Sequence, residues 1–523
     1  MVCFCRCIFL GGKNIVLSVS KLNMLNNRVR NSRFKSLRDK LAPANWTPGT
    51  LIILLIPFAL LISFIVVKGG IIGAAGILAV VVGLPIVYGI IAYPEFGITV
   101  LVVASFMLNY VSEFLPNGTP TGILLDAITY MLIFGFFLKK KFDNSWYYFK
   151  NPISYLVLAW LAYNFLEAIN PVSPSILAWV YTVRTVGFIM LMYFIFLYQI
   201  QRIEFIKFLF KLWLGLCLLA AISGFQQENF GFLSFEKTWY YSDPARVKFW
   251  FINGHWRKTA IFADPVTFSY NMVVAVTMCI CFVMLKISRW KKVLMMLLIP
   301  FYILAMLYSG TRGAYVLLPA ALALLAILKF NKKIVTGVVA AGFLLLIVIF
   351  MPTSNPTIKR FQSAFNPSKD ASFNVRAENQ RRIKPYILSH PIGGGLGSVG
   401  VWGRRFAPNS FLANFPPDSG YVRVAVEMGY IGLILFCTLM FVILKTGINN
   451  YYLIQDPELK NYCLAMILVI FVYNVGNYPQ QALVQYPSNI LFYMASALLS
   501  ITLRLDIDKR KELADTTAKS LKD

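Results

Sequence analysis

The sequence predicts an all-α membrane protein, a polytopic transmembrane helix bundle of about 12–14 spans with a long extracytoplasmic loop containing short helices. Of its 523 residues, 58% are apolar and only 14% are charged, a balance far from that of soluble globular domains. Apolar runs of about 17 to 23 residues, enough to cross roughly 30 Å of hydrocarbon, recur along nearly the whole chain.

Fourteen apolar segments account for the predicted spans, and a polar or charged break follows each of them. The segments are residues 50–67, 71–92, 97–111, 122–138, 153–168, 176–197, 208–225, 266–285, 293–308, 315–328, 334–351, 424–444, 463–478 and 483–502. Only Lys68, Gly69 and Gly70 separate the first two, so that pair depends on a very short turn.

Positive charge predicts the orientation of the bundle. With a cytoplasmic N-terminus, 31 of the 49 Lys and Arg residues fall in tails and inner loops, and the short outer loops are nearly free of them. Most of the net charge of +27 is then topogenic, and nucleic acid is not expected as a partner. The resulting divisions are a basic cytoplasmic tail (1–49), eleven spans with an outer loop at 226–265 (50–351), a long extracytoplasmic loop (352–423), three spans (424–502) and a basic cytoplasmic tail (503–523).

The two long outer loops hold 15 further basic residues, and the positive-inside rule is weak for long loops. These charges therefore need a functional explanation. None of the eight cysteines lies in these loops, so neither a disulfide framework nor thiol chemistry is expected there. The glycine-rich stretch at 393–399 lacks the lysine and the strand-to-helix context of a phosphate loop, and we interpret it as a tight turn.

Within the larger loop, the pattern of residues 375–388 predicts a basic amphipathic helix. Ile383, Tyr386 and Ile387 would share one face, and the basic residues, Arg376 among them, would lie mostly on the others. Such a helix would lie along the membrane surface. Attraction to anionic lipid headgroups alone is the alternative explanation of its charge.

Two arginines lie where orientation does not require a charge. Arg312 stands between two apolar segments at the outer face, which makes it a functional candidate; an arginine that snorkels to the headgroups is the alternative. Arg184 lies about two turns inside the sixth segment and is expected to face the bundle interior or an aqueous cavity. Either it forms a structural ion pair with Glu167, or it binds an anion.

Together with these, Arg257 and Lys258 before the eighth segment, Arg376 in the loop, and Arg423 form an expected cluster of cations at the outer leaflet. Guanidinium groups bind phosphate oxygens bidentately and stay charged at physiological pH. A pyrophosphate is the ligand that this charge predicts, and Arg184, Arg257 and Arg423 are expected to bind substrate.

Asp418 lies in an Asp-Ser-Gly turn directly before the twelfth segment. A carboxylate near a sugar hydroxyl can act as general base in glycosyl transfer. The alternative is that Asp418, with Ser419, caps the following helix.

The order of these motifs resembles the O-antigen ligase and O-antigen polymerase family. The motifs are SGTRG at 309–313, a Ser-x-x-x-Arg pair (Ser372 and Arg376), HPIGGGLG at 390–397, a short polar motif and ExGxxG (Glu427, Gly429 and Gly432). The stretches at 224–227 and 260–265 also look like family features, and the similarity covers roughly residues 156–502.

The resemblance implies an integral-membrane glycosyltransferase, independent of metal and cofactor, at the outer face of the bacterial inner membrane. Its donor would be an oligosaccharide on undecaprenyl pyrophosphate, and its acceptor a second glycan. Membrane lipids and a chain-length regulator or flippase would be further partners. Carried over to this chain, Arg312 and Arg376 would hold the pyrophosphate, and Asp418 completes the expected catalytic set.

One departure concerns the base. Ligases of this family carry a histidine before ExGxxG, whereas this chain has Asp418, and its only histidines are His255 and His390. The substitution favours a repeat-unit polymerase over a ligase. An unperturbed aspartate has a pKa of about 3.9 against about 6.5 for histidine, so the arginines could instead provide most of the catalysis. A polysaccharide transporter without transferase activity and a scaffolding subunit are the competing classes.

Overall fold

The computed structural model describes residues 48–520, except 116–118, 120, 141–145, 253, 355 and 366–370. The predicted basic tail at 1–49 lies almost wholly outside the described residues. The chain divides into two compact units, Met1–Ile86 and Val87–Asp523. All described residues of the first unit belong to helix α2 (Pro48–Ala92), whose backbone leaves helical geometry at Gly70, with φ of 55°. This break falls between the first two predicted spans.

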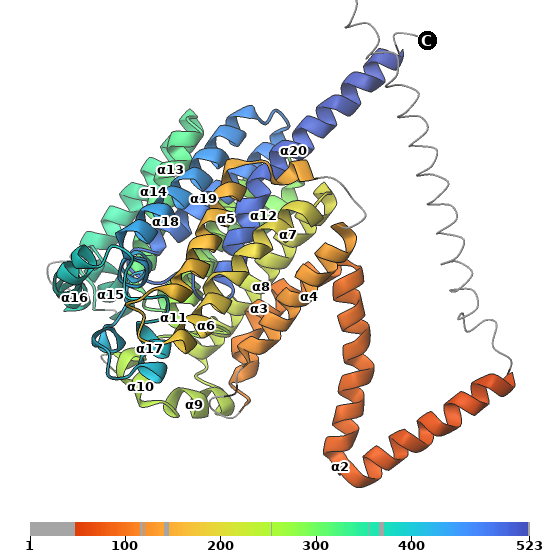
Figure 1. Ribbon diagram of the computed structural model, residues 1–523. Helices are drawn as coiled ribbons and strands as arrows, with labels where there is room; N and C mark the ends of the chain where they lie inside the picture. Colours follow the sequence, from red (N-terminus) through yellow and green to blue (C-terminus); the bar gives the residue numbers. More distant parts are fainter. Residues whose placement is uncertain are drawn as a thin grey trace, which may run out of the picture. The chain divides into compact units, whose positions relative to one another are not determined.

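The second unit is a bundle of helices with one short β-hairpin (Figure 1). Its longer helices are α3 (Pro94–Ser112), α4 (Gly122–Lys140), α5 (Pro152–Leu166), α6 (Ile176–Val186), α7 (Leu191–Gln199), α8 (Ile203–Asn229), α11 (Pro265–Val283), α12 (Arg289–Tyr308), α13 (Arg312–Leu328), α14 (Lys332–Phe350), α16 (Ala371–Ser389), α18 (Gly420–Leu453), α19 (Pro457–Gly476) and α20 (Ser488–Ser520). Its short elements are η2 (Trp146–Phe149), η3 (Glu167–Ile169), η4 (Phe188–Met190), α9 (Ser234–Tyr241), α10 (Pro244–Trp250), β1 (Phe251–Ile252), β2 (His255–Trp256), α15 (Pro356–Ser363), α17 (Gly400–Phe406) and η6 (Phe411–Asn414).

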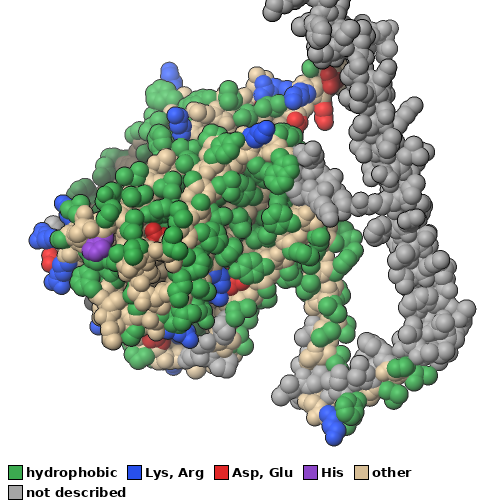
Figure 2. All heavy atoms as spheres, in the orientation of Figure 1, with side chains coloured by type: hydrophobic (Ala, Val, Ile, Leu, Met, Phe, Trp, Pro, Cys, Tyr) green, Lys and Arg blue, Asp and Glu red, His purple; other side chains and the backbone are tan. Residues whose placement is uncertain are grey.

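Ten helices of the described chain are long and apolar enough to cross a membrane. Three shorter apolar helices, Gly76–Ala92, Gly122–Leu138 and Arg312–Leu328, coincide with other predicted spans. Hydrophobic side chains cover much of the visible face of the bundle, and Lys and Arg lie mostly toward its ends (Figure 2). The prediction of an all-α, multi-pass membrane protein is confirmed.

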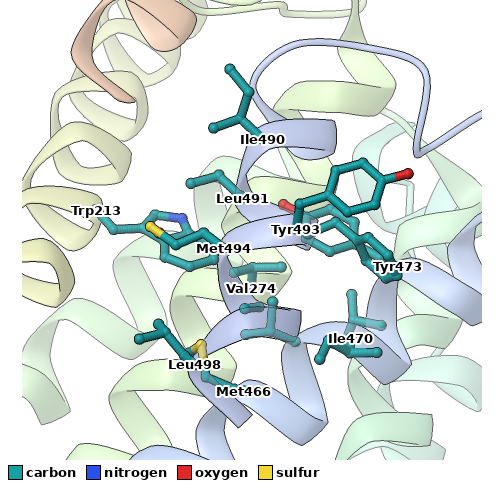
Figure 3. Close-up of a cluster of buried hydrophobic side chains, with 14 of the residues drawn as sticks. Trp213, Val274, Met466, Ile470, Tyr473, Ile490, Leu491, Tyr493, Met494 and Leu498 are labelled. Carbon is teal, nitrogen blue, oxygen red and sulfur yellow. The ribbon is translucent and has the colours of Figure 1, made fainter. Parts of the chain in front are cut away.

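The core of the bundle lies where α8, α11, α19 and α20 meet. Buried side chains from all four helices form one cluster there, to which Trp213, Val274, Tyr473 and Met494 belong (Figure 3). In α14, by contrast, no residue is buried. A helix this apolar and this exposed is expected to face lipid.

Two predicted spans have different limits in the structure. The segment at 176–197 is broken after Gly187, where η4 separates α6 from α7. The last span begins at Ser488 instead of residue 483, because Pro487 disfavours helical geometry in the residue before it. The polar stretch between α19 and α20 is therefore a loop, which contributes to the site described below.

The connections that carry the unexplained charge lie together. Figure 1 shows α9, α10, α15, α16 and α17 at one end of the bundle, opposite the end from which α20 projects. The turn between α12 and α13 belongs to this end, since α15 packs against both helices. The two long loops of the sequence thus meet on one side.

Candidate active site

The SGTRG motif forms the turn between α12 and α13. The Ser309 hydroxyl accepts a hydrogen bond from the Thr311 N–H at 3.1 Å, and the Thr311 hydroxyl donates to the Pro265 carbonyl at 3.1 Å. Gly310 has φ of 58°, a conformation that side chains disfavour. The turn places Arg312 in the first position of α13, where backbone N–H groups and the helix dipole favour an anion.

Two further arginines are held against this turn. Arg257 donates through Nε to the Ser309 carbonyl at 3.0 Å and through an Nη to the Thr311 hydroxyl at 3.0 Å. Arg360 donates through Nε to the Gly310 carbonyl at 2.7 Å. Burial, reinforced by the positive charge of Arg360, lowers the pKa of Arg257 to about 10. The turn therefore gathers guanidinium groups from three separate parts of the chain.

These arginines line a cavity of about 530 Å³. Its described lining contains five basic side chains and no carboxylate. The basic residues are His255, Arg257, Arg312, Lys359 and Arg360. We call this space the cationic cavity. Several like charges around one space favour a ligand with more than one negative charge.

An apolar groove of about 500 Å³ adjoins the cationic cavity. Leu307 lines both spaces, and the groove is otherwise formed by aliphatic and aromatic side chains of α11, α12, α13, α14 and α15. A second apolar space of about 330 Å³ shares Ile280, Ile299 and Leu322 with the groove and continues it to Leu325. From Tyr315 to Leu325, at 1.5 Å per residue, the path follows α13 for about 15 Å.

The stretches at 224–227 and 260–265 support the wall of the cavity. The Gln227 side chain donates to the carbonyl of Ala260 and accepts from its N–H, at 3.2 and 3.0 Å. This clamp holds Ala260 at φ of 53°, which is unusual for a residue with a Cβ. Asp264 caps α11 by accepting from the N–H groups of Val266 and Thr267. Both stretches thus fix the entry of the chain into α11.

Asp418 does not cap the helix that follows it. The N-cap of α18 is Ser419, whose hydroxyl accepts from the Val422 N–H at 3.4 Å. Asp418 instead lines a cavity of about 160 Å³ with Thr267, Tyr270 and the polar loop before α20. Burial raises the pKa of its carboxyl, against the opposing effects of Arg376 and a hydrogen bond from Asn379. The alternative that Asp418 and Ser419 cap the helix is therefore confirmed for Ser419 and wrong for Asp418.

The Asp418 cavity lies beside the SGTRG turn. Tyr270 lines this cavity, and its hydroxyl is 3.2 Å from the position that a Cβ on Gly313 would occupy. Gly313 directly follows Arg312, so a larger residue would press into the partition between the two cavities. Tyr270 thus connects the wall of the Asp418 cavity to the residue that follows Arg312 in the cationic cavity.

One face of helix α16 lies over the carboxylate of Asp418. Arg376 and Asn379, three residues apart, both act on Asp418, and Ile383 is buried one turn further along. Ile383 packs against Val399 and other apolar residues of the loop and of α18. The helix begins at Ala371, close to the predicted start, but the expectation that Arg376 lies on another face than Ile383 is wrong. The side chain of Ser372, its motif partner, is outside the described set.

The glycine-rich turn and ExGxxG interlock. Gly394 and Gly395 donate their N–H groups to the carbonyls of Val426 and Glu427, both at 2.9 Å. Gly429 has φ of 66°, and a Cβ there would lie 1.9 Å from the Pro391 carbonyl oxygen. Only glycine allows the two backbones to approach this closely. Together, the two motifs fix the position of the start of α18 and therefore of the turn that contains Asp418.

Arg423 belongs to this support and not to the cationic cavity. Its Nε donates to the buried Glu427 carboxylate at 3.1 Å, and an Nη donates to Gln481 at 3.0 Å. Gln481 in turn donates to the carbonyl of Pro417. This chain of hydrogen bonds ties the polar loop to the residue before Asp418. Arg423 therefore positions the turn that contains Asp418. Its hydrogen bonds to Glu427 and Gln481 do not favour the predicted direct contact with substrate.

Arg184 is also separate from the cationic cavity. Its Nε lies 3.1 Å from an Asp126 carboxylate oxygen on α4, and its guanidinium is 5.7 Å from the centre of the Tyr181 ring. Glu167, the predicted partner, instead accepts from Asn170 at 2.8 Å. Of the two alternatives for Arg184, the structure has the ion pair, but with Asp126 and not with Glu167. The reason is that α4 packs against α7, which follows α6 along the chain, and the sequence does not reveal this packing. The cations that the sequence predicts as one cluster therefore lie in separate places in the structure.

Sequence analysis did not single out Arg360 or the glutamines at 480, 481 and 485. The signal for Arg360 was a Lys-Arg pair in a short segment of helical periodicity directly after a span. Gln485 was missed because it fell within the span assigned to 483–502, and Gln480 and Gln481 because only four residues separated that span from the one at 463–478. His390 stacks on Tyr386, with ring centres 4.0 Å apart, and stays in its turn as predicted. His255 lies 3.3 Å from the Glu228 carboxylate and lines the cationic cavity.

Comparison with known families agrees with the motif order. The model of the O-antigen ligase family matches residues 298–437. That segment begins within α12, contains the SGTRG turn, α15, α16, the glycine-rich turn and Asp418, and ends within α18. No curated protein matches the chain. The resemblance to the O-antigen ligase and polymerase family is confirmed over residues 298–437.

Proposed function

We propose that this chain, in which residues 298–437 match the O-antigen ligase family, polymerises or ligates glycans carried on a polyprenyl pyrophosphate such as undecaprenyl pyrophosphate. The reaction is an inverting glycosyl transfer at the outer face of the bacterial inner membrane. The donor is the lipid-linked oligosaccharide and the acceptor a second glycan. The protein works without a metal or organic cofactor, because its cations can neutralise the leaving group.

One observation carries the proposal: the cationic cavity adjoins the apolar groove, and Leu307 lines both. A polyprenyl pyrophosphate combines a compact double anion with a long hydrocarbon chain. Arg257, Arg312 and Arg360 would hold the pyrophosphate, and the groove beside lipid-facing α14 would admit the first isoprene units from the membrane.

The chemistry follows from the position of the carboxylate. A hydroxyl oxygen of the acceptor attacks the anomeric carbon of the donor, and the bond from that carbon to the pyrophosphate oxygen breaks with its electron pair on the pyrophosphate. Asp418 takes the proton of the attacking hydroxyl. The arginines stabilise the charge that develops on the departing pyrophosphate. Arg376, beside Asp418, can contact the same pyrophosphate from the acceptor side.

We favour a repeat-unit polymerase over a ligase. Asp418 stands where the family's ligases carry a histidine, and burial raises the pKa of this carboxyl, which improves it as a base. Gln480 and Gln485 line the same cavity as Asp418, and their side-chain amides offer donors and acceptors that suit a sugar acceptor.

A transporter is the second candidate, and reconstitution distinguishes the two. The purified chain is placed in liposomes with a labelled lipid-linked oligosaccharide, and both glycan products and released polyprenyl pyrophosphate are measured. The enzyme forms longer or transferred glycan with one equivalent of released lipid pyrophosphate. Movement of the labelled lipid across the bilayer without release would overturn the proposal. Arg312→Ala should abolish release, and Arg381→Ala, an exposed cation on α16, is the matched control.

A further inference from the structure

A further polar cavity, of about 460 Å³, lies beside the outer end of α3. Trp239, Phe249 and Trp250 from α9 and α10 form one part of its lining. Asn109, Asp243 and Arg246 are among the polar side chains of the rest. We call it the aromatic cleft. None of the chemistry proposed above uses it.

The aromatic rings of the cleft are held in place by their neighbours. The rings of Trp239 and Trp250 lie 5.7 Å apart at 38°, and the Arg246 guanidinium covers Trp239 at 3.7 Å from its ring centre. Arg246 also donates to the Trp239 carbonyl, and its charge is balanced by Asp243 at 3.8 Å. These contacts leave Phe249, 60% exposed, at the open side of the cleft.

This lining suits an uncharged carbohydrate better than other ligands. A sugar ring has an apolar face of C–H groups that packs on aromatic rings and an edge of hydroxyls that both donate and accept. Asn109 and Asp243 offer the matching donors and acceptors. A lipid tail would leave these polar groups without partners, and a polyanion would meet Asp243 beside the single arginine of the lining.

The cleft is coupled to the cationic cavity by the β1–β2 hairpin. Phe249 and Trp250, just before the hairpin, line the cleft, whereas Ile252 and His255, within it, line the cationic cavity. The N–H of Arg257 donates to the carbonyl of Trp250 at 2.9 Å, which ties the two ends of the hairpin together. A chain attached to a pyrophosphate in the cationic cavity would reach the cleft by crossing this hairpin.

We infer that the aromatic cleft binds the oligosaccharide of the lipid-linked donor. The assignment to the donor follows from the hairpin, because the cleft adjoins the cavity for the pyrophosphate to which the donor glycan is attached. The acceptor has its own polar cavity around Asp418. The inference rests on the proposed function and adds to it the place where the sugars are recognised.

Binding to the full-length protein in nanodiscs tests the inference. Two ligands are compared: sugar-free polyprenyl pyrophosphate, and the same lipid carrying the oligosaccharide extracted from the source cells. Phe249→Ala and Asn109→Ala should weaken binding of the glycan-bearing lipid about three- to tenfold, as expected for loss of one stacking or hydrogen-bonding contact. They should leave the Kd for the sugar-free lipid unchanged. Phe230→Ala, at an 81% exposed phenylalanine in the same outer loop, is the matched control and should change neither.

Each of the other possible outcomes leads to a different conclusion. Equal affinity of both variants and wild type for the glycan-bearing lipid would overturn the inference. So would a loss confined to the KM for the acceptor, which would assign the cleft to the acceptor instead. Failure of wild-type protein to bind the sugar-free lipid would refute the proposed function itself, before any cleft variant is measured.

Discussion

Arg360 donates a hydrogen bond from Nε to the carbonyl of Gly310 at 2.7 Å, and a Cβ on Gly310 would lie 2.9 Å from that nitrogen. The glycine thus leaves room for a cation from a helix fifty residues further along the chain. Arg360→Ala should reduce turnover of the lipid-linked donor about 100-fold, the usual effect of removing one group that stabilises developing charge. Arg360→Lys keeps the charge but loses the planar guanidinium, and an intermediate rate is expected.

Release of polyprenyl pyrophosphate by purified protein provides the measurement for both Arg360 variants. Arg382→Ala removes an exposed cation on α16 and should retain wild-type turnover. If Arg360→Ala turned over like wild type, the cationic cavity would not be the pyrophosphate site.

Asp418→Asn should abolish the acid limb of the pH profile of kcat. The base must be ionised, and burial raises its pKa above the ordinary value near 4, so wild-type kcat falls as pH drops through that raised pKa. The asparagine amide does not ionise in this pH range. The residual rate of the variant, lower by about 10²- to 10⁴-fold, should therefore not show the fall at low pH. An unchanged acid limb in Asp418→Asn would assign the base to another group.

Ser419→Ala is the matched control for the neighbouring position. Loss of the N-cap hydroxyl should destabilise the protein by about 1 kcal/mol, seen as a lower Tm, with the pH profile retained. The two variants therefore separate a chemical from a structural role within one turn.

Sequence reasoning predicted the helices and the two long basic loops, which the structure brings together at one end of the bundle, but not how the cations are divided. Hydropathy and length are local properties, so the spans follow from them, and Arg312 stood out because a charge between two spans is costly. Which arginines meet depends on helix packing. Arg184 pairs with Asp126 because α4 packs against α7, the helix that follows α6, and Arg257 reaches the SGTRG turn through the fold of the 226–265 loop. Neither contact has a local signature.

Gly429→Ala should be strongly destabilising. At φ of 66°, a methyl group there would lie 1.9 Å from the Pro391 carbonyl oxygen, which cannot move without opening the glycine-rich turn. A loss of about 3 kcal/mol or more is expected, through backbone strain and the clash together. The measurement is the Tm in detergent. Gly215→Ala, at a helical glycine with open space around it, should leave the Tm nearly unchanged or raise it.

Arg423→Met should cost more stability than loss of an exposed pair. The variant leaves the Glu427 carboxylate, with a side chain 3% exposed, without its cation, and about 3–5 kcal/mol is expected. Adding Glu427→Gln removes the buried charge and should restore part of the Tm. For comparison, Arg382→Ala breaks an exposed pair with Glu378 and should cost less than about 1 kcal/mol. Additive effects of Arg423→Met and Glu427→Gln would show that the two side chains are not coupled.

Glu113, at the end of α3, should make the protein less stable as pH rises. It is 7% exposed, its carboxylate oxygens have no hydrogen-bond partner among the described residues, and burial together with Glu236 raises its pKa to about 8 against the effect of Arg246. The folded state thus holds a proton that the unfolded chain releases near pH 4.5. The stability that this proton provides is fully present below about pH 4.5 and is lost as pH rises through 8. Glu113→Gln cannot ionise, so its Tm should match that of wild type near pH 5 and exceed it increasingly up to pH 9. Glu378→Gln, at an exposed carboxylate on α16, controls for a general change in charge. A Tm difference for Glu113→Gln that is the same at pH 5 and pH 9 would mean that this carboxyl is already ionised in the folded protein at the lower pH.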